Sequence, residues 1–249
     1  GAGGGGGAGG EARPDQGSDV TVRGVGPLAT HTLGGPQRIV RKGFPPLRGR
    51  ALQDRSRDLL ENHGEIRRAL MWEPRGHIVM FGAVVVPPAD PAADPCLVFL
   101  DGGGAVEMCV HGTIGAVTAL IETGRLKVGR DGWLTVDTPA GSVRVRVRRS
   151  GNRVSAVELE GVPALSVASG LPARVAGKAV GYDLAYAGNL IAIVTGRDLG
   201  IKVQPAAFRA PVDAGLAVKC QAQKALGAAG GGLGRGPRVG DDPLPPRAA

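Results

Sequence analysis

The chain contains 249 residues, of which 43% are hydrophobic, 21% are charged and only 3% are aromatic, and its formal net charge is +8. This length suits one large domain or two small ones, and the aliphatic residues suffice for a packed core. The arginines are dispersed with almost no aromatic side chains among them, which argues against a nucleic-acid-binding protein. No apolar run is long enough to span a bilayer and no signal peptide is visible, so we expect a soluble cytoplasmic protein that binds no membrane.

The three cysteines, Cys96, Cys109 and Cys220, show none of the spacings typical of metal sites. Their odd number indicates free thiols in a reducing compartment. The glycines at 102–104 lack both the GxGxxG spacing and the lysine of phosphate-binding loops, and no nucleophile-elbow motif is present. The sequence therefore predicts that no metal ion and no nucleotide cofactor is bound, and it gives no support to a serine hydrolase.

Low-complexity segments rich in glycine stand at both ends, over 1–19 and 227–249, and are expected to be disordered. Between them, hydrophobic periodicity predicts a mixture of helices and strands. In chain order these are a helix over 51–70, buried strands over 77–86 and 96–100, a helix over 114–123, strands over 142–148 and 154–162, a buried strand over 190–195 and a helix over 212–226. This mixture indicates an α+β fold.

The strand over 142–148 has the cleanest alternation in the chain. Three valines and three arginines take turns along it, so the two kinds of side chain point to opposite faces. The members are Val143, Val145 and Val147 on one face and Arg144, Arg146 and Arg148 on the other. The pattern predicts a half-exposed antiparallel strand with buried valines and a solvent-exposed row of arginines.

The segment Glu-Met-Cys-Val-His-Gly-Thr-Ile-Gly at 107–115 is the strongest candidate for a reactive site. It follows the strand over 96–100 and an Asp-Gly-Gly-Gly turn, and it precedes the helix over 114–123. Cys109 is therefore expected at or next to a helix N-terminus, where free N–H groups and the helix dipole favour an anion. That position predicts a lowered thiol pKa, and the neighbouring amides offer a docking place for a substrate carboxylate.

Residues 108–115 resemble the first catalytic motif of the proline racemase family, which also contains hydroxyproline epimerases and trans-3-hydroxyproline dehydratases. Four further stretches resemble segments of that family in the same order. They are the region from His-Thr to Arg-Ile-Val at 31–40, Glu-Pro-Arg-Gly-His at 73–77 with its flanks, Asp-Thr-Pro-Ala-Gly at 137–141 and Tyr-Ala-Gly-Asn at 186–189. The Asp-Gly-Gly-Gly turn before the cysteine is closer to the racemases than to the dehydratases.

The resemblance implies a two-lobed fold of the diaminopimelate-epimerase type, in which each lobe is a curled mixed sheet around a central helix and the substrate lies between the lobes. Residues 20–134 would then form the first lobe, and residues 135–226 would form only an incomplete second lobe. Glu73, Arg75 and His77 are expected to form buried charge pairs that shape the first lobe. Cys96 is expected in the core.

In the family, two opposed thiols exchange a proton with the α-carbon of proline or hydroxyproline without a cofactor, and members tend to form homodimers. Cys109 matches the first thiol. The resemblance assigns the backbone amides of Val110, His111 and Gly112 to the substrate carboxylate, and the His111 side chain to the neighbourhood of the substrate nitrogen. The second thiol belongs to an Asp-Arg-Ser-Pro-Cys-Gly-Thr-Gly-like segment that this sequence lacks.

Cys220 does not replace the second thiol, because its surroundings are helix-like and contain no glycine-rich turn. One thiol cannot complete a two-base racemisation alone, so full racemase turnover is not expected. Leu33, Val79 and Val110 also depart from the family pattern, which has a glycine, an aspartate and a glycine there. Three interpretations stay open: a racemase or epimerase that carries one of its two thiols, a non-catalytic remnant or interaction protein of the same family, and a dehydratase-like lyase.

Overall fold

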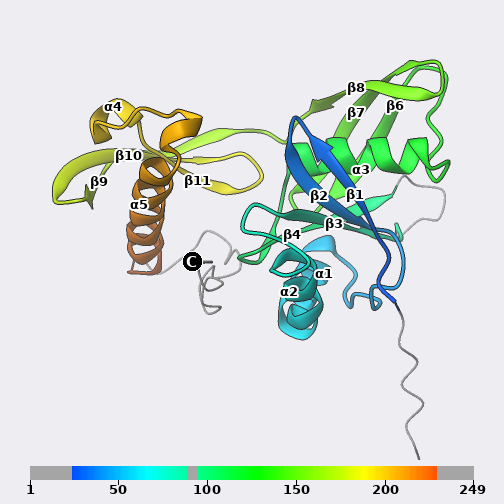
Figure 1. Cartoon of the computed structure of the whole chain (residues 1–249), viewed down its shortest axis with the longest axis horizontal. Coiled ribbons are helices and arrows are strands. Elements are labelled where there is room, and N and C mark those ends of the chain that lie inside the picture. The colour runs from blue at the N-terminus through cyan, green and yellow to red at the C-terminus, as the bar shows by residue number, and fades with distance from the viewer. Residues whose placement is uncertain (1–23, 89–94, 229–249) are drawn as a thin grey trace, which may run out of the picture.

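The computed structural model describes residues 24–88 and 95–228, which form a large and a small β-sheet with helices packed against them (Figure 1). The strands of the large sheet are β1 (Pro27–Thr32), β2 (Gly35–Val40), β3 (Phe81–Val86), β4 (Cys96–Asp101), β5 (Ala105–Val106), β6 (Trp133–Thr138), β7 (Gly141–Ser150) and β8 (Arg153–Glu160). Those of the small sheet are β9 (Leu165–Val175), β10 (Lys178–Tyr186) and β11 (Leu190–Ile193). The helices are α1 (Leu52–Asn62), α2 (Gly64–Met71), α3 (Val110–Glu122), α4 (Gly196–Leu199), the short 3-10 helix η1 (Pro205–Ala207) and α5 (Arg209–Ala228).

The large sheet has the strand order β1-β2-β3-β4-β6-β7-β8, and the short strand β5 pairs with β4. Most neighbours are antiparallel. The β2–β3 and β4–β6 pairs are parallel, because α1 and α2 connect the first pair and α3 connects the second. In this order, β4 lies between β3 and β6.

Helices cover both faces of the large sheet because its central strands are apolar on both sides. Along β4, Leu97 and Phe99 join the cluster under α3, whereas Val98 and Leu100 join the cluster under α1 and α2. This alternation follows from the two-residue period of a strand, and it explains why the run 96–100 shows no polar positions.

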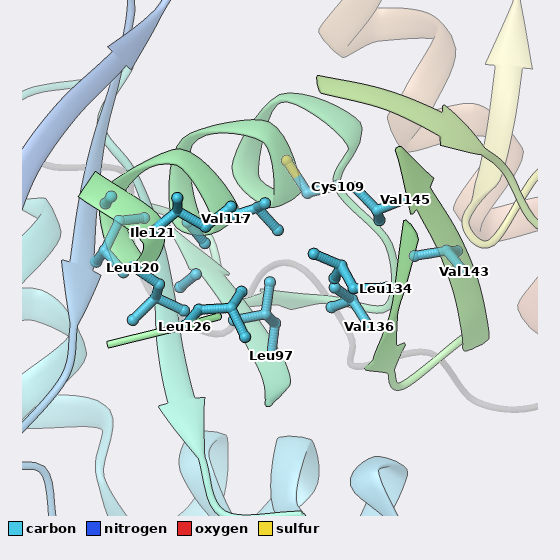
Figure 2. Close-up of a cluster of buried hydrophobic side chains, with 14 of the residues drawn as sticks. Leu97, Cys109, Val117, Leu120, Ile121, Leu126, Leu134, Val136, Val143 and Val145 are labelled. Atoms are coloured by element: carbon cyan, nitrogen blue, oxygen red, sulfur yellow. The ribbon is translucent and has the colours of Figure 1, made fainter. Parts of the chain in front are cut away.

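The cluster between α3 and the sheet holds the candidate cysteine (Figure 2). The helix contributes Val117, Leu120 and Ile121, and strands β6 and β7 contribute Leu134, Val136, Val143 and Val145. Cys109 belongs to the same cluster, at the N-terminal end of α3. The alternation predicted for β7 is confirmed, since its valines are buried and its arginines are exposed.

The small sheet has the order β11-β10-β9 and carries α5 on one face (Figure 1). Val180, Tyr182 and Leu184 of β10 point toward this helix, which contributes Ala214 and Val218 to the shared core. Helix α4 and η1 lie between β11 and α5 in the chain. Mixed sheets with packed helices confirm the α+β class.

The sheet boundary lies later in the chain than the sequence indicates. A change of lobe was expected between residues 134 and 135, but β6, β7 and β8 continue the large sheet as far as Glu160. The reason is the parallel contact of Cys96 with Asp137, which ties β6 to the edge of β4. The small sheet begins only at Leu165.

Several predicted elements have different limits in the structure. The helix over 51–70 is divided at His63 into α1 and α2, and the strand over 77–86 begins only at Phe81 after a turn. The segment 190–195 is a strand only to Ile193, and it is largely exposed rather than buried because it forms the edge of the small sheet. The glycine-rich ends expected over 1–19 and 227–249 lie outside the described residues, apart from the last two residues of α5.

Candidate active site

Cys109 is the N-cap residue of α3 and is only 7% exposed. Its backbone is extended, with φ −145° and ψ 108°, and its carbonyl accepts the first hydrogen bonds of the helix from the backbone N–H and hydroxyl of Thr113, both at 2.9 Å. The thiol replaces the usual hydroxyl of an N-cap, because Sγ accepts the N–H of Gly112 at 3.2 Å. A side chain at 112 would force the thiol to move, since a Cβ there would lie 2.9 Å from that sulfur.

Burial dominates the acidity of this thiol and raises the pKa of Cys109 from its ordinary 9.0 to about 11. The charge of Asp101 acts in the same direction, whereas the backbone N–H groups of Gly112 and His111 lower the pKa. The prediction of a lowered thiol pKa is therefore wrong. The helix N-terminus is present as expected, but the cysteine lies inside the apolar cluster. There the loss of water destabilises the thiolate more than the two backbone N–H groups stabilise it.

His111 lies beside the thiol, with 3.2 Å between its Nδ1 and the Sγ of Cys109. Burial lowers the pKa of this imidazole, so it is neutral at neutral pH. Its ring meets the ring of Phe81 edge to face, with 4.8 Å between the centroids. The structure thus brings together Cys109 and His111, two of the residues that the sequence selected.

A buried amide fixes the first turn of α3 from the sheet. Gln37 on β2 is 1% exposed, and its Nε2 donates to the carbonyl of His111 at 2.7 Å and to the hydroxyl of Thr32 at 2.8 Å. The same hydroxyl donates to the carbonyl of His111 at 3.1 Å. Gly115 makes room for Gln37, because a Cβ at that position would overlap the side-chain oxygen of Gln37. No role for Gln37 was predicted, because its contacts with α3 depend on the packing of β2 against that helix.

The turn after β4 borders the site. The Oδ1 of Asp101 accepts the N–H groups of Gly103 and Gly104, both at 2.8 Å, and this closes the turn. Arg67 and Trp72 each donate to the carbonyl of Gly102 at 2.8 Å and thereby hold the turn against α2. A cavity of about 170 Å³ lies between this turn and the segment before β3. Phe81, Trp72 and His77 are among its lining residues.

On its other side the site is held by the small sheet. The side-chain amide of Asn189, in the turn between β10 and β11, bonds the backbone of Glu107 and Met108 just before Cys109. The segment 186–189 was noted for its resemblance alone, and no role for Asn189 was predicted. That role depends on a contact between residues 81 positions apart, which the sequence does not reveal.

The remaining candidates are spread over the molecule. Val110, the first residue of α3, is 53% exposed. Glu73 and Arg75 are exposed in the turn after α2, so the expected buried charge pairs are wrong. Cys96 is buried as predicted, in the cluster under α1 and α2 on the opposite face of the sheet from Cys109. Cys220 is exposed on α5.

Two further observations concern ligands and membranes. Within residues 24–88 and 95–228, no group of three or more histidine, cysteine, aspartate or glutamate side chains is arranged to hold a metal ion. None of the helices in this part of the chain combines the length and apolar character that a bilayer crossing requires.

The buried cysteine at the start of α3 lies within a stretch that matches a known family. A model of the proline racemase family matches residues 28–232. The chain belongs to the proline racemase family. It is 40% identical over 165 residues to a 4-hydroxyproline 2-epimerase of Shewanella loihica, covering 66% of this chain and 50% of that relative. It is 34% identical over 185 residues to a proline racemase of Acetoanaerobium sticklandii, covering 73% of this chain and 55% of that relative.

A solved member of the family has the same fold. The crystal structure of a hydroxyproline epimerase from Agrobacterium vitis, with trans-4-hydroxy-L-proline bound, superposes with a TM-score of 0.75 at 26% identity. The superposition covers 80% of this chain and 59% of that chain. Over the part that the superposition covers, the α+β fold of this chain is therefore racemase-like. This chain spans about half the length of the curated relatives it matches.

Proposed function

We propose that this chain carries one half of a cofactor-independent racemase or epimerase site for the α-carbon of proline or hydroxyproline. Cys109 is the acid/base thiol of that half. The observation that carries the proposal is a buried thiol that caps a helix N-terminus within a stretch matching the proline racemase family. The relatives named above are a proline racemase and hydroxyproline epimerases, which supports this substrate class.

The thiol is suited to the acid half of the reaction. Its pKa of about 11 keeps it protonated at neutral pH, so it delivers a proton to one face of the α-carbon while a base on the opposite face removes one. Withdrawal of the α-proton places negative charge on the substrate carboxylate, which needs hydrogen-bond donors. The amides of Val110, His111 and Gly112 at the start of α3 would supply them, and the N–H of Gly112 would be shared with the thiol. The neutral imidazole of His111 would face the substrate nitrogen.

The opposing base is not among the cysteines of this sequence. Cys96 lies on the other face of the sheet and Cys220 is exposed on α5. We therefore propose a two-lobed fold of the diaminopimelate-epimerase type in which the small sheet is the incomplete second lobe. The core of the small sheet is shared mainly with α5, whereas helices cover both faces of the large sheet, and this difference supports the proposal. By itself, the chain is not expected to convert one enantiomer into the other.

The decisive test is exchange of the α-proton of L-proline and trans-4-hydroxy-L-proline in deuterated water, followed by NMR. Wild type is compared with Cys109→Ser and with the matched control Cys220→Ser, which removes an exposed thiol. Exchange that is lost only in Cys109→Ser supports the proposal. Because no opposing thiol is present in this sequence, Cys109 must itself lose its proton to act as the base, so exchange should rise as the pH approaches 11. Absence of exchange at pH 10 in folded wild type would sink the proposal. Loss of water from trans-3-hydroxy-L-proline in the same assay would assign the lyase chemistry of the dehydratases instead.

A second candidate function is a non-catalytic interaction protein of the same family. The observation that favours it is a set of large apolar side chains left exposed on and around the small sheet: Leu165, Leu190, Ile191, Ile193 and Phe208. Exposed apolar surface promotes association, including the homodimer expected for this family. Size-exclusion chromatography with and without proline separates the two functions. A compact species that proline stabilises against heat supports the enzyme, and a self-associating species indifferent to proline supports the interaction protein.

A further inference from the structure

The turn between β10 and β11 lies directly against the two residues that precede Cys109. The Oδ1 of Asn189 accepts the backbone N–H groups of Glu107 and Met108, at 2.9 and 3.4 Å. Its Nδ2 donates to the carbonyl of Met108 at 2.6 Å. One side chain thus satisfies three backbone groups of a segment that belongs to neither a strand nor a helix.

Two further contacts join the same turn to the same segment. Gly188 has φ +81°, and a Cβ there would lie 2.5 Å from the Cβ of Met108, so the turn approaches as closely as a glycine allows. The side chain of Glu107 forms a hydrogen bond with Tyr186. From the large sheet, the N–H of Ala140 donates to the carbonyl of Glu107 at 3.2 Å.

We propose that Asn189 is a positioning residue of the Cys109 site: it holds the backbone of Glu107 and Met108 from the small sheet and thereby sets the direction of the thiol. This inference deepens the proposed function and rests on it for its catalytic meaning. The small sheet is then part of the machinery of the first thiol, in addition to any part in binding the substrate.

The geometry explains why an amide is needed at this position. Asn189 both accepts from N–H groups and donates to a carbonyl, and aspartate of the same shape lacks the donor. Asn189→Asp would place a carboxylate oxygen next to the carbonyl of Met108, where the two oxygens repel. The disturbance reaches Cys109 directly, because Cys109 follows Met108 and its extended backbone aims the side chain into the cluster under α3.

The pKa of Cys109 can serve as a measure of the position of its thiol. On this proposal, the burial of the thiol depends on residues 107–108 being held in place by Asn189. Burial is the largest cause of the raised pKa of Cys109. The titratable groups that act on it are His111, 3.2 Å from the sulfur, and Asp101 at the end of β4. Neither is held by Asn189, since Asp101 bonds the N–H groups of Gly103 and Gly104 and the His111 ring packs on Phe81. We therefore expect both to stay in place in the Asn189 variants, so that a shift in the titration of the thiol measures the loss of its positioning.

The experiment follows alkylation of the folded protein by iodoacetamide between pH 7 and 11, with peptide mass spectrometry to resolve the three cysteines. Wild type is compared with Asn189→Asp and Asn189→Ala, and with Asn152→Asp in the exposed turn between β7 and β8 as a matched control. Exposed Cys220 serves as an internal standard in each sample.

We expect both Asn189 variants to move the midpoint of the Cys109 pH–rate profile to lower pH and to raise its rate at pH 8 by about ten-fold. Cys220 should be unchanged in them, and Asn152→Asp should match wild type at both cysteines. Superposed Cys109 profiles for wild type and the Asn189 variants would overturn the proposal. If circular dichroism shows that both variants fail to fold, Asn189→Ser, which keeps a short hydrogen-bonding side chain, takes their place. A shifted Cys109 profile in this variant supports the proposal, and a superposed profile overturns it.

The alkylation assay is independent of catalysis. If wild type exchanges no substrate α-proton and the Asn189 variants still shift the Cys109 profile, the proposed function fails and the positioning role of Asn189 stands. If wild type exchanges the α-proton and the profiles superpose, the proposed function stands and the role of Asn189 falls.

Discussion

At Cys109, two opposing influences meet on one sulfur atom. The helix N-terminus offers N–H groups that stabilise a thiolate, and the apolar cluster under α3 withdraws the water that a thiolate needs. Burial prevails, which leaves a protonated thiol at neutral pH. The fold therefore stabilises the neutral form of this group, and its stability becomes coupled to pH in the alkaline range.

Because the pKa of Cys109 rises from 9.0 to about 11 on folding, the folded chain holds a proton that the unfolded chain loses between these values. Stability from this group is complete below pH 9 and is lost as pH rises toward 11, by roughly 2 kcal/mol. Urea unfolding at pH 8.5 and 10.5 should show wild type losing more stability than Cys109→Ala. The comparison cancels the alkaline titration of Cys96 and Tyr186, whose pKa values burial also raises. Equal losses in the two proteins would contradict the burial of the thiol.

Gly115 tests the contact between α3 and the buried amide of Gln37. Gly115→Ala puts a Cβ onto the Gln37 side chain, and we expect a loss of about 2–3 kcal/mol in the free energy of unfolding. Gly161→Ala is the matched control, since nothing lies within 4 Å of a Cβ there and its effect should stay within about 0.5 kcal/mol. In a double-mutant cycle, Gln37→Ala should offset part of the loss. Additive effects would mean that the two residues do not touch.

At the scale of single elements, β7 separates packing from charge within one strand. Val145→Ala removes two methyl groups from a fully buried position and should cost about 2 kcal/mol of unfolding free energy. Arg146→Ala on the exposed face removes a guanidinium 5.7 Å from the centroid of the Trp133 ring, and should cost less than about 1 kcal/mol. Chemical denaturation of both variants measures the difference. Equal losses would show that the arginine row contributes to the fold as much as the valines do.

The elements that the sequence revealed are those with a strong local pattern. The alternation along β7, the uniformly apolar β4 and the apolar spacing of α3 and α5 were sufficient to predict these elements. The strands β1, β2, β6, β9 and β10 were not predicted. Prolines or glycines, which are typical of turns, interrupt β1, β2 and β9. In β10, the alternating residues Val180, Tyr182 and Leu184 that face α5 do carry a strand signal, and it was missed.

The candidate site was predictable only in part. Cys109 and His111 stand in one short motif that a reader of the sequence can find. Gln37 and Asn189 reach them across the fold, through pairing of β2 beside β3 and through the small sheet. The thiol pKa was predicted with the wrong sign because burial, which decides it, is a property of the packed core and not of the motif.

For the whole molecule, the two sheets have separate cores of different size. The large sheet is packed on both faces, and the small sheet shares its core mainly with α5, with Leu199 of α4 at the border of this core. We expect hydrogen exchange to show lower protection in β9, β10 and β11 than in β6, β7 and β8. Leu184→Ala, at a position 4% exposed, should accelerate exchange throughout the small sheet and α5 and leave β7 unchanged. Uniform acceleration over both sheets would instead indicate a single cooperative unit.

The two parallel pairs in the large sheet also govern the order in which the chain assembles. The hairpins β6–β7 and β9–β10 close loops of only a few residues. The parallel pairs β2–β3 and β4–β6 close much longer loops, which contain α1 and α2 in the first pair and α3 in the second. Long loop closures are slow, so we expect the hairpins to form before the two parallel pairs. Gln37 lies on β2, in the first parallel pair, and Cys109 lies in the connection between the two strands of the second pair. We therefore expect the thiol of Cys109 to stay exposed to solvent until these pairs form, so that this sulfur is most vulnerable to oxidation before the chain has folded.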